Sequence, residues 1–163
     1  MVEYFQMLAR YNRLANQRVL DVCAGLAPGE FERERFGSFG SIRRTLNHVL
    51  LSDQVWMGRL TGVPLGLTRV DGVPFPELPE LRAAREAEDR RMDEYMADLK
   101  PEALASVFGY RNLAGHELRD PLYLVLGHVF NHQTHHRGQV HAMLSEAGVR
   151  GLSLDMHRLG RQA

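Results

Sequence analysis

The stretch LGHVFNHQTHHRGQVH, from Leu126 to His141, contains five of the eight histidines of the chain. At about 100° of rotation per helical residue, His132 and His136 point within about 40° of each other and lie one turn apart. Apolar side chains fall on the same face, within about 80° of His132: Val125, Val129, Val140 and Met143. Because buried polar groups need partners, two histidines that point into an apolar core indicate a function rather than a solvated surface. An i, i+4 pair of histidines can hold one divalent metal ion.

The other histidines of this stretch are weaker candidates for the same ion. His128 lies one turn before His132, and about 12 Å of helix rise separates it from His136, so we expect it at the edge of a pocket. His135, at about −60° from His132, lies on the edge of the same face. The helical wheel directs the following side chains away from that face: Tyr123, Phe130, Arg137 and His141.

Apolar periodicity predicts three further long helices earlier in the chain. Apolar residues recur at steps of three and four over residues 4–26, which predicts a first amphipathic helix. A second helix is predicted from a cap at Ser38 or Ser41 to about Leu60. The third, over about 80–99, has a thin apolar stripe and many charges. That pattern is typical of a peripheral helix with one solvent-facing side.

The last helix is predicted to begin with Asp120 as its N-cap and Pro121 in its first position, and to end before Gly148. It would span about 27 residues, or roughly 40 Å. Two short extended pieces flank NLAG, residues 112–115, and predict a small hairpin or an irregular crossover. Four long helices with long crossover connections predict an all-α fold, a four-helix bundle, with a short hairpin before the last helix.

Length and composition exclude several classes of protein. At 163 residues the chain can bury a hydrophobic core, and we expect one domain over residues 1–163. Its 20 basic and 20 acidic residues give a formal net charge of zero, which argues against binding to nucleic acid or to a membrane surface. No apolar run approaches the roughly 20 residues that a membrane span needs. The single cysteine, Cys23, excludes an intrachain disulfide, and we expect a cytoplasmic protein.

A single ion held by the histidine pair needs at least one further ligand from another helix. The candidates are His48, Asp53, Glu88 and His116. His48 lies in the buried second helix, whereas His116 lies in a loop, which holds a ligand less firmly. Asp53 and Glu88 interrupt apolar stripes, so each is a candidate for burial near the site, with an ion pair as the alternative. The pattern alone does not choose between His48 and Asp53.

Three segments resemble motifs of the DinB/YfiT-like family of metalloenzymes. HQTHHRGQV, His132–Val140, resembles the HxxxHRGQ signature, and IRRTLNHVLLSDQVWMGRL, Ile42–Leu60, resembles the second-helix motif, a histidine followed eight residues later by tryptophan. LSEAGVRGLSLDM resembles the segment that usually follows the last helix. The resemblance covers the chain in order and length, and it implies an up-down-down-up bundle that is often a homodimer. Carried over by motif position, it implies a metal triad of His48, His132 and His136.

Three histidine ligands would leave a divalent ion its full charge and an open position for water or substrate. Such a site lowers the pKa of bound water, towards about 7 in the best-studied case, and equally favours a bound thiolate. Zinc, nickel and iron all accept imidazole, and we expect zinc or nickel ahead of iron. The resemblance implies transfer of a low-molecular-weight thiol to an electrophilic small molecule, or a related hydrolysis or isomerisation. The alternative is a non-catalytic, metal-binding stress-response protein in which the metal is structural.

Residues around the triad are expected to orient its ligands or to line its pocket. The candidates are Asp53, His128 and Gln139. No residue is singled out as catalytic. Tyr123, Phe130 and the apolar surplus of the second helix are expected to form the surface of a homodimer.

Overall fold

Four long helices, two short ones and one small sheet make up residues 1–159, which the computed structural model describes. The long helices are α1 (Val2–Ala24), α2 (Ile42–Thr61), α3 (Leu78–Ala97) and α5 (Leu122–Glu146). The short helices are α4 (Pro101–Leu104) and α6 (Met156–Leu159), and β1 (Val107–Arg111) and β2 (Glu117–Pro121) form an antiparallel hairpin. The predictions of a mostly helical fold and of a short hairpin are confirmed. The expected single domain extends over residues 160–163, which lie outside the described part of the chain.

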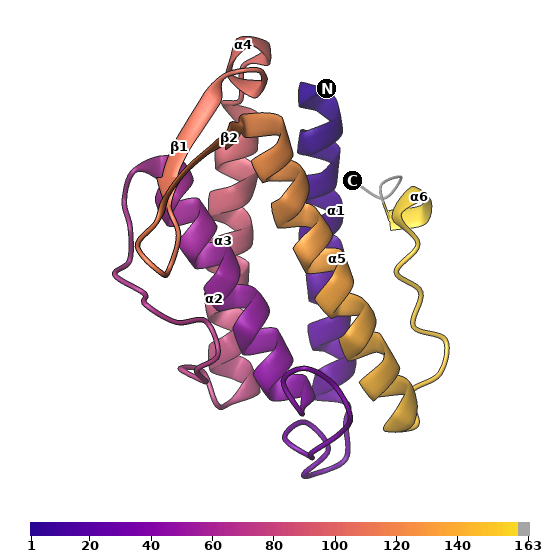
Figure 1. The fold of residues 1–163 in the computed structure, drawn as a ribbon. Helices are drawn as coiled ribbons and strands as arrows, with labels where there is room; N and C mark the ends of the chain where they lie inside the picture. The colour runs from indigo at the N-terminus through magenta and orange to yellow at the C-terminus, as the bar shows by residue number, and fades with distance from the viewer. Residues whose placement is uncertain (160–163) are drawn as a thin grey trace.

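The long helices surround a shared interior. α1 packs against α3 and α5, and α2 packs against the same two helices. Along the chain, α1 and α5 run downward in the view of Figure 1, whereas α2 and α3 run upward. One buried cluster contains Met57, Met92 and Leu126 near the hairpin, and a second contains Ile42, Val140 and Leu144 at the other end of α5.

Ser41 caps the first turn of α2, and it is one of the two residues predicted for this role. Its side-chain oxygen accepts a hydrogen bond from the backbone N–H of Arg44 at 3.2 Å, which satisfies one of the free donors of the helix N-terminus. At the other end, Gly62 adopts a left-handed conformation with φ of 70°, which favours glycine and ends the helix. The second helix thus begins and ends close to the predicted residues.

The start of α5 differs from the prediction. Asp120 is not an N-cap but belongs to β2, where it pairs with Phe108, and its carboxylate accepts a hydrogen bond from the Tyr110 hydroxyl at 2.9 Å. The strand pairing continues to Pro121, opposite Val107, so the helix begins only at Leu122. The hairpin therefore uses the residues that local capping preference would assign to the helix.

α5 is buried on two sides, which corrects the helical wheel. Phe130 and Arg137 were expected to point outward, yet they are only 5% and 4% exposed. The Phe130 ring stacks on Phe5 of α1, with 6.3 Å between the centroids. The helical-wheel prediction assumed that only one face of the helix is packed, whereas α5 contacts both α1 and α2. Tyr123 is exposed as expected, but the burial of Phe130 removes it from the expected dimer surface.

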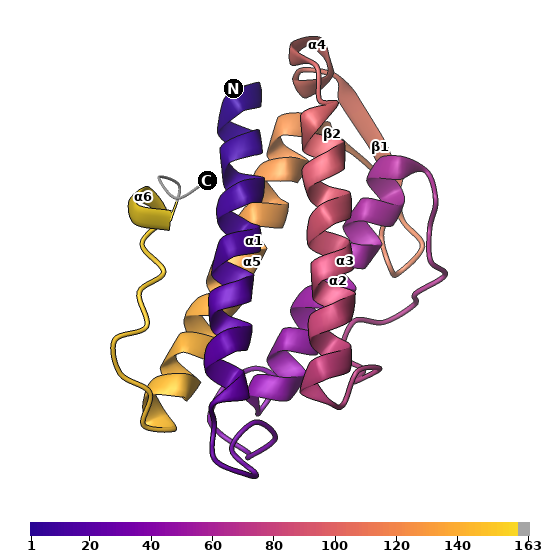
Figure 2. The ribbon, with the colours of Figure 1, turned by 180° about the vertical axis from the view of Figure 1, so that it is seen from behind.

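The segment after α5 folds back along α1. Figure 2 shows this segment and α6 lying beside α1. The Tyr11 hydroxyl donates a hydrogen bond to the carbonyl of Leu154 at 3.0 Å, and Leu159 is buried in a cluster with Tyr11 and Ala15. Among residues 1–159, no helix has the length and apolar character needed to cross a membrane.

Candidate metal centre

Three histidines from two helices meet between α2 and α5. His48 comes from the middle of α2, and His132 and His136 come from successive turns of α5. One ring nitrogen of each lies within 4.8 Å of the corresponding atoms of the other two. The Nε2 atoms of His48 and His132 are 3.1 Å apart, and the His132 and His136 ring centroids are 4.5 Å apart. The structure thus brings together the three residues of the predicted triad.

Two of the three imidazoles are oriented by an acceptor at Nδ1. The Nδ1 atom of His48 lies 2.8 Å from the carbonyl oxygen of Val70, and Nδ1 of His136 lies 2.8 Å from Oε1 of Gln139. Both acceptors require a proton on Nδ1, so each neutral ring keeps the lone pair of its Nε2 atom free. Histidines that bind metals usually carry such a hydrogen bond on the other ring nitrogen. Gln139, a residue predicted to orient a ligand or line the pocket, thus contacts the His136 ring.

The three rings are held in the neutral form. Burial lowers the pKa of His48 and of His136, although the hydrogen bonds to Val70 and Gln139 oppose the shift. Burial and the neighbouring histidines lower the pKa of His132 to about 3. A neutral imidazole is the form that can donate a lone pair to a metal.

The donor set fits a divalent transition-metal ion. Zinc–nitrogen bonds of about 2.0–2.1 Å put two ligands of a tetrahedral ion roughly 3.3 Å apart. The observed 3.1 Å between the Nε2 atoms of His48 and His132 is close to that spacing. The geometry brings three neutral nitrogen donors within 4.8 Å of one another, a donor set that suits zinc, nickel or iron better than the oxygen-preferring magnesium or calcium.

Two contacts of the centre come from loops that sequence reasoning did not single out. Phe39, in the loop before α2, stacks on His48 with 3.9 Å between ring centroids and meets the edge of His136 at 5.5 Å. Val70 belongs to the loop after α2. Neither residue lies in a periodic segment, so no signal in the pattern identifies them.

The remaining histidine candidates lie at the edge of the centre or away from it. His128 packs against Trp56 and His132, with ring centroids 5.4 Å and 6.0 Å apart, which agrees with its expected place at the pocket edge. His135 lies 3.2 Å from the Gln139 amide nitrogen. His116 is exposed in the hairpin turn. The ring of His141 contacts the Leu152 carbonyl at 3.1 Å.

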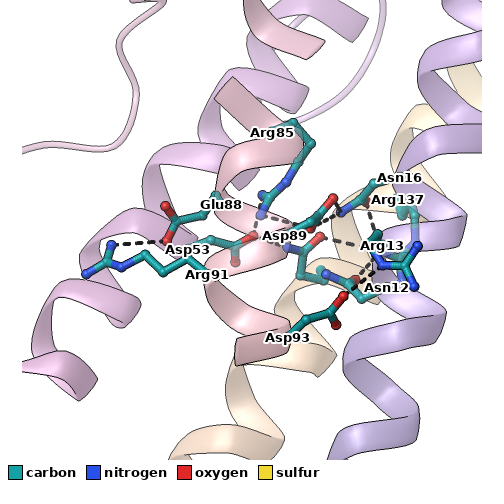
Figure 3. A network of polar contacts seen from close by, with 11 residues as sticks. Asn12, Arg13, Asn16, Asp53, Arg85, Glu88, Asp89, Arg91, Asp93 and Arg137 are labelled. Atoms are coloured by element: carbon teal, nitrogen blue, oxygen red, sulfur yellow. Dashed lines mark hydrogen bonds and ion pairs between the residues drawn. The ribbon is translucent and has the colours of Figure 1, made fainter. Parts of the chain in front are cut away.

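Asp53 lies in a buried polar network instead of at the histidines (Figure 3). Its Oδ2 atom accepts a hydrogen bond from Arg85 of α3 at 2.5 Å and another from Gln133 of α5. Arg85 also pairs with Asp89 at 3.0 Å. The ion-pair alternative is therefore the one found for Asp53. Glu88 is buried too, and it pairs with Arg91 at 3.3 Å.

The same network contains Arg137 of the HRGQ sequence. Its guanidinium donates hydrogen bonds to the side-chain oxygens of Asn12 and Asn16 on α1, and it lies 5.2 Å from the centre of the Tyr11 ring. Asn16 in turn donates to Asp89 at 3.1 Å. The network joins all four long helices through side chains: Asn16 of α1, Asp53 of α2, Arg85 of α3 and Gln133 of α5.

Electrostatics in this network are dominated by burial. Burial raises the pKa of Asp53 to about 7, although the positive charge of Arg85 acts in the other direction. The pKa values of Glu88 and Asp89 are raised for the same reason.

Comparison with known proteins agrees with the geometry of the centre. The family model described as the DinB family matches residues 1–163. The chain is similar to Protein DinB of Bacillus subtilis (strain 168), with 30% identity over 159 residues, which cover 95% of this chain and 92% of the relative. A match over the whole chain, together with this level of identity, leads to one conclusion: the chain belongs to the DinB family.

Proposed function

We propose that the protein binds a divalent metal ion at His48, His132 and His136, and that it uses the ion to transfer a low-molecular-weight thiol to an electrophilic small molecule. The observation that carries this proposal is the convergence of three ring nitrogens within 4.8 Å. Two of the rings are already oriented by Val70 and Gln139, so the centre is largely organised for a ligand.

The chemistry of the centre follows from its charge. A bound divalent ion would favour the deprotonated form of a thiol or of water. Three neutral ligands leave the charge of the ion uncompensated, which strengthens that effect. Phe39 covers one face of the His48 ring and meets the His136 ring at an edge. We propose zinc or nickel, with iron as a third candidate, because all three accept imidazole.

In the proposed transfer, the thiol sulfur forms a bond to an electrophilic carbon. A leaving group departs from that carbon, and the proton of the thiol passes to solvent. The partners are thus a small thiol and a small electrophile. Metal-assisted hydrolysis or isomerisation at the same centre is a related reaction.

A second candidate is a non-catalytic metal-binding protein of the stress response. In that case the metal would be structural, holding α2 and α5 together. The support for it is that His128 lies beside His132, at 6.0 Å between ring centroids, and a shift of this ring would bring a fourth nitrogen closer. A centre closed by a fourth protein ligand would not accept a substrate.

The wider setting of the centre is inferred in the same way. We infer a single domain built as an up-down-down-up four-helix bundle, which is supported by the packing of α1 and α2 against both α3 and α5. We also infer a cytoplasmic homodimer. Tyr123, which is 43% exposed, and the exposed neighbour Leu124 support a partner surface at the start of α5. Sedimentation that shows only monomer at micromolar concentration would contradict the dimer.

The test combines metal analysis with a thiol-transfer assay. Purified protein should contain about one equivalent of zinc, nickel or iron, and His48→Ala should lose most of it. Metal-loaded protein should consume a low-molecular-weight thiol in the presence of an aryl halide and release halide in equal amount, and His48→Ala should not. A panel of thiols that changes neither the absorption spectrum of the nickel-loaded protein nor the halide concentration would favour the structural alternative.

A further inference from the structure

A pocket of about 540 Å³ lies between the C-terminal part of α2, the loop that follows it and the hairpin. Figure 1 shows the hairpin and this loop beside the upper end of α2. The walls are formed by Val55 and Arg59 of α2, by residues 64–68 and by residues 109–113. None of the three histidines of the metal centre lines it.

One cation in this pocket has no carboxylate partner. The lining residues include Arg59 and Arg111 but no aspartate or glutamate. Arg111 pairs with Glu117 at 3.0 Å, whereas Arg59 forms no ion pair with any residue in the described part of the chain. Its guanidinium carbon instead lies 4.5 Å from the centre of the Trp56 ring and 5.3 Å from that of Tyr110. A half-buried cation without a counter-charge favours an anion in this pocket.

The rest of the pocket is mainly apolar. Val55, Leu65 and Leu67 line it together with Tyr110. The loop lies directly against α2 because residue 58 is glycine: a Cβ atom there would meet the Cα of Pro64 at 3.1 Å and the carbonyl of Val63 at 3.2 Å. Apolar walls around one cation without a carboxylate partner suit a ligand with an apolar body and a single acidic group.

The pocket is connected to the metal centre through aromatic rings. Trp56 contacts Tyr110, with 5.1 Å between ring centroids, and it also contacts His128 at 5.4 Å. The ring of His128 lies 6.0 Å from that of His132. Arg59 and Tyr110 of the pocket thus contact a row of rings, Trp56 and His128, that ends at the metal centre.

We propose that this pocket binds a small organic carboxylate, whose carboxyl group pairs with Arg59 and whose apolar body rests against Val55, Tyr110 and the leucines of the loop. One guanidinium provides the parallel N–H donors that a carboxylate accepts. That the carboxylate is one of the two substrates of the metal centre rests on the proposed function, and its binding to the pocket does not.

Trp56 offers a readout, because it is the only tryptophan of the chain and its ring contacts Arg59 and Tyr110, which both line the pocket. The full-length protein in its metal-loaded form would be titrated with 3-phenylpropanoate while the tryptophan fluorescence is recorded. We expect a saturable change. The uncharged 3-phenylpropanamide should bind at least about tenfold more weakly, because a charge-assisted hydrogen bond is lost. Inorganic phosphate should produce no saturable change, because it has no apolar body.

Two variants and one matched control locate the binding site. Arg59→Met keeps an apolar chain over Trp56 and should weaken 3-phenylpropanoate binding about tenfold or more. Gly109→Leu adds a bulky side chain at a residue that lines the pocket, where an added Cβ atom would meet no atom within 4 Å, and we expect it to weaken binding. Arg111→Met removes an equal charge from the same pocket, but one already paired with Glu117, so it should weaken binding less than threefold.

The proposal would be overturned by the absence of saturable binding, by equal binding of acid and amide, or by folded Arg59→Met binding like the wild type. Equal losses in Arg59→Met and Arg111→Met would also overturn it. Saturable binding of phosphate at the same site would show a general anion site in its place. Repeating the titration on His48→Ala separates the two proposals. If this variant binds 3-phenylpropanoate but does not transfer a thiol, the pocket does not depend on the metal centre. If the wild type binds 3-phenylpropanoate but transfers no thiol, only the proposed function is contradicted.

Discussion

The Nε2 atoms of His48 and His132 lie 3.1 Å apart, although 84 positions separate the two residues in the chain. The hydrogen bond from Nδ1 of His48 to Val70 leaves a lone pair on its Nε2 atom. Without a metal, the Nε2 atom of His132 must carry the proton of its neutral ring and donate it to the Nε2 atom of His48, because two lone pairs at this distance would repel each other. The low pKa of His132, about 3 because of burial and the neighbouring histidines, prevents it from holding a second proton at neutral pH. A shared divalent ion satisfies both lone pairs.

Metal binding is therefore expected to stabilise the folded protein. A ligand at a hundred times its dissociation constant adds about 2.7 kcal/mol to the free energy of unfolding, which raises the melting temperature of a protein of this size by about 5–10 °C. Titration of metal-free protein with zinc or nickel in thermal melts should show this rise. His48→Ala should abolish it, and His141→Ala, a histidine of α5 outside the triad, should retain it. An unchanged rise in His48→Ala would show that the ion binds elsewhere.

Gln139 is expected to affect metal affinity without contacting the ion. Gln139→Leu removes the acceptor 2.8 Å from Nδ1 of His136, so the ring loses its fixed orientation. Loss of such a partner lowers metal affinity by about 10–100-fold. Competition with a chelator of known affinity measures this change. Gln17→Leu provides the control, because this glutamine of α1 lines a pocket with residues of α3, and equal affinities in both variants would contradict the orienting role.

Much of this centre was predictable from local pattern and motif. The period of apolar residues predicts the long helices, because one face of each packs against its neighbours. The four-residue spacing predicts that His132 and His136 point the same way. His48 follows from the family motif alone, because the pattern around it does not separate it from Asp53. What chooses His48 is the way α2 packs on α5, which brings its ring to the pair.

The partners within the buried polar network were not predictable for a related reason, although Asp53 and Glu88 were candidates for burial. A helical wheel assigns charged residues to solvent. It therefore predicts that Arg137 points outward and that one side of α3 faces solvent. Their burial depends on partners from other helices: Asn12 for Arg137, and Asp53 for Arg85. Those partnerships are absent from any single segment. The contacts of Phe39 and Val70 with His48 were not predicted for the same reason, since they join segments that lie apart in the sequence.

Removing Arg85 is expected to destabilise the fold strongly. Arg85 is 5% exposed and pairs with both Asp53 and Asp89, so Arg85→Met leaves two buried carboxyl groups without their counter-charge. Breaking a buried pair in this way costs about 3–5 kcal/mol. Arg82→Met, three residues earlier on the same helix, breaks an ion pair with the exposed Asp21 and should cost about 1 kcal/mol or less. Urea unfolding curves compare the two, and similar midpoints would mean that the network contributes little.

Asp53 is expected to make the stability depend on pH. Burial raises its pKa from 3.8 to about 7, so between these values the folded state binds a proton that the unfolded state has released. Its contribution to stability is therefore fully present below about pH 4 and is lost as the pH rises through about 7. The slope approaches about 1.4 kcal/mol per pH unit where the two states differ by one proton.

Asp53→Asn isolates this contribution, because asparagine does not titrate whereas Glu88, Asp89 and the histidines are present in both proteins. The free energy of unfolding of the wild type minus that of Asp53→Asn should fall between pH 4 and pH 7, as measured by urea unfolding in metal-free buffer. The same subtraction with Asp21→Asn, at the exposed pair with Arg82, should show no such fall. A difference that rises with pH would mean that Arg85 keeps Asp53 ionised throughout, and that attraction to the guanidinium outweighs the cost of burial.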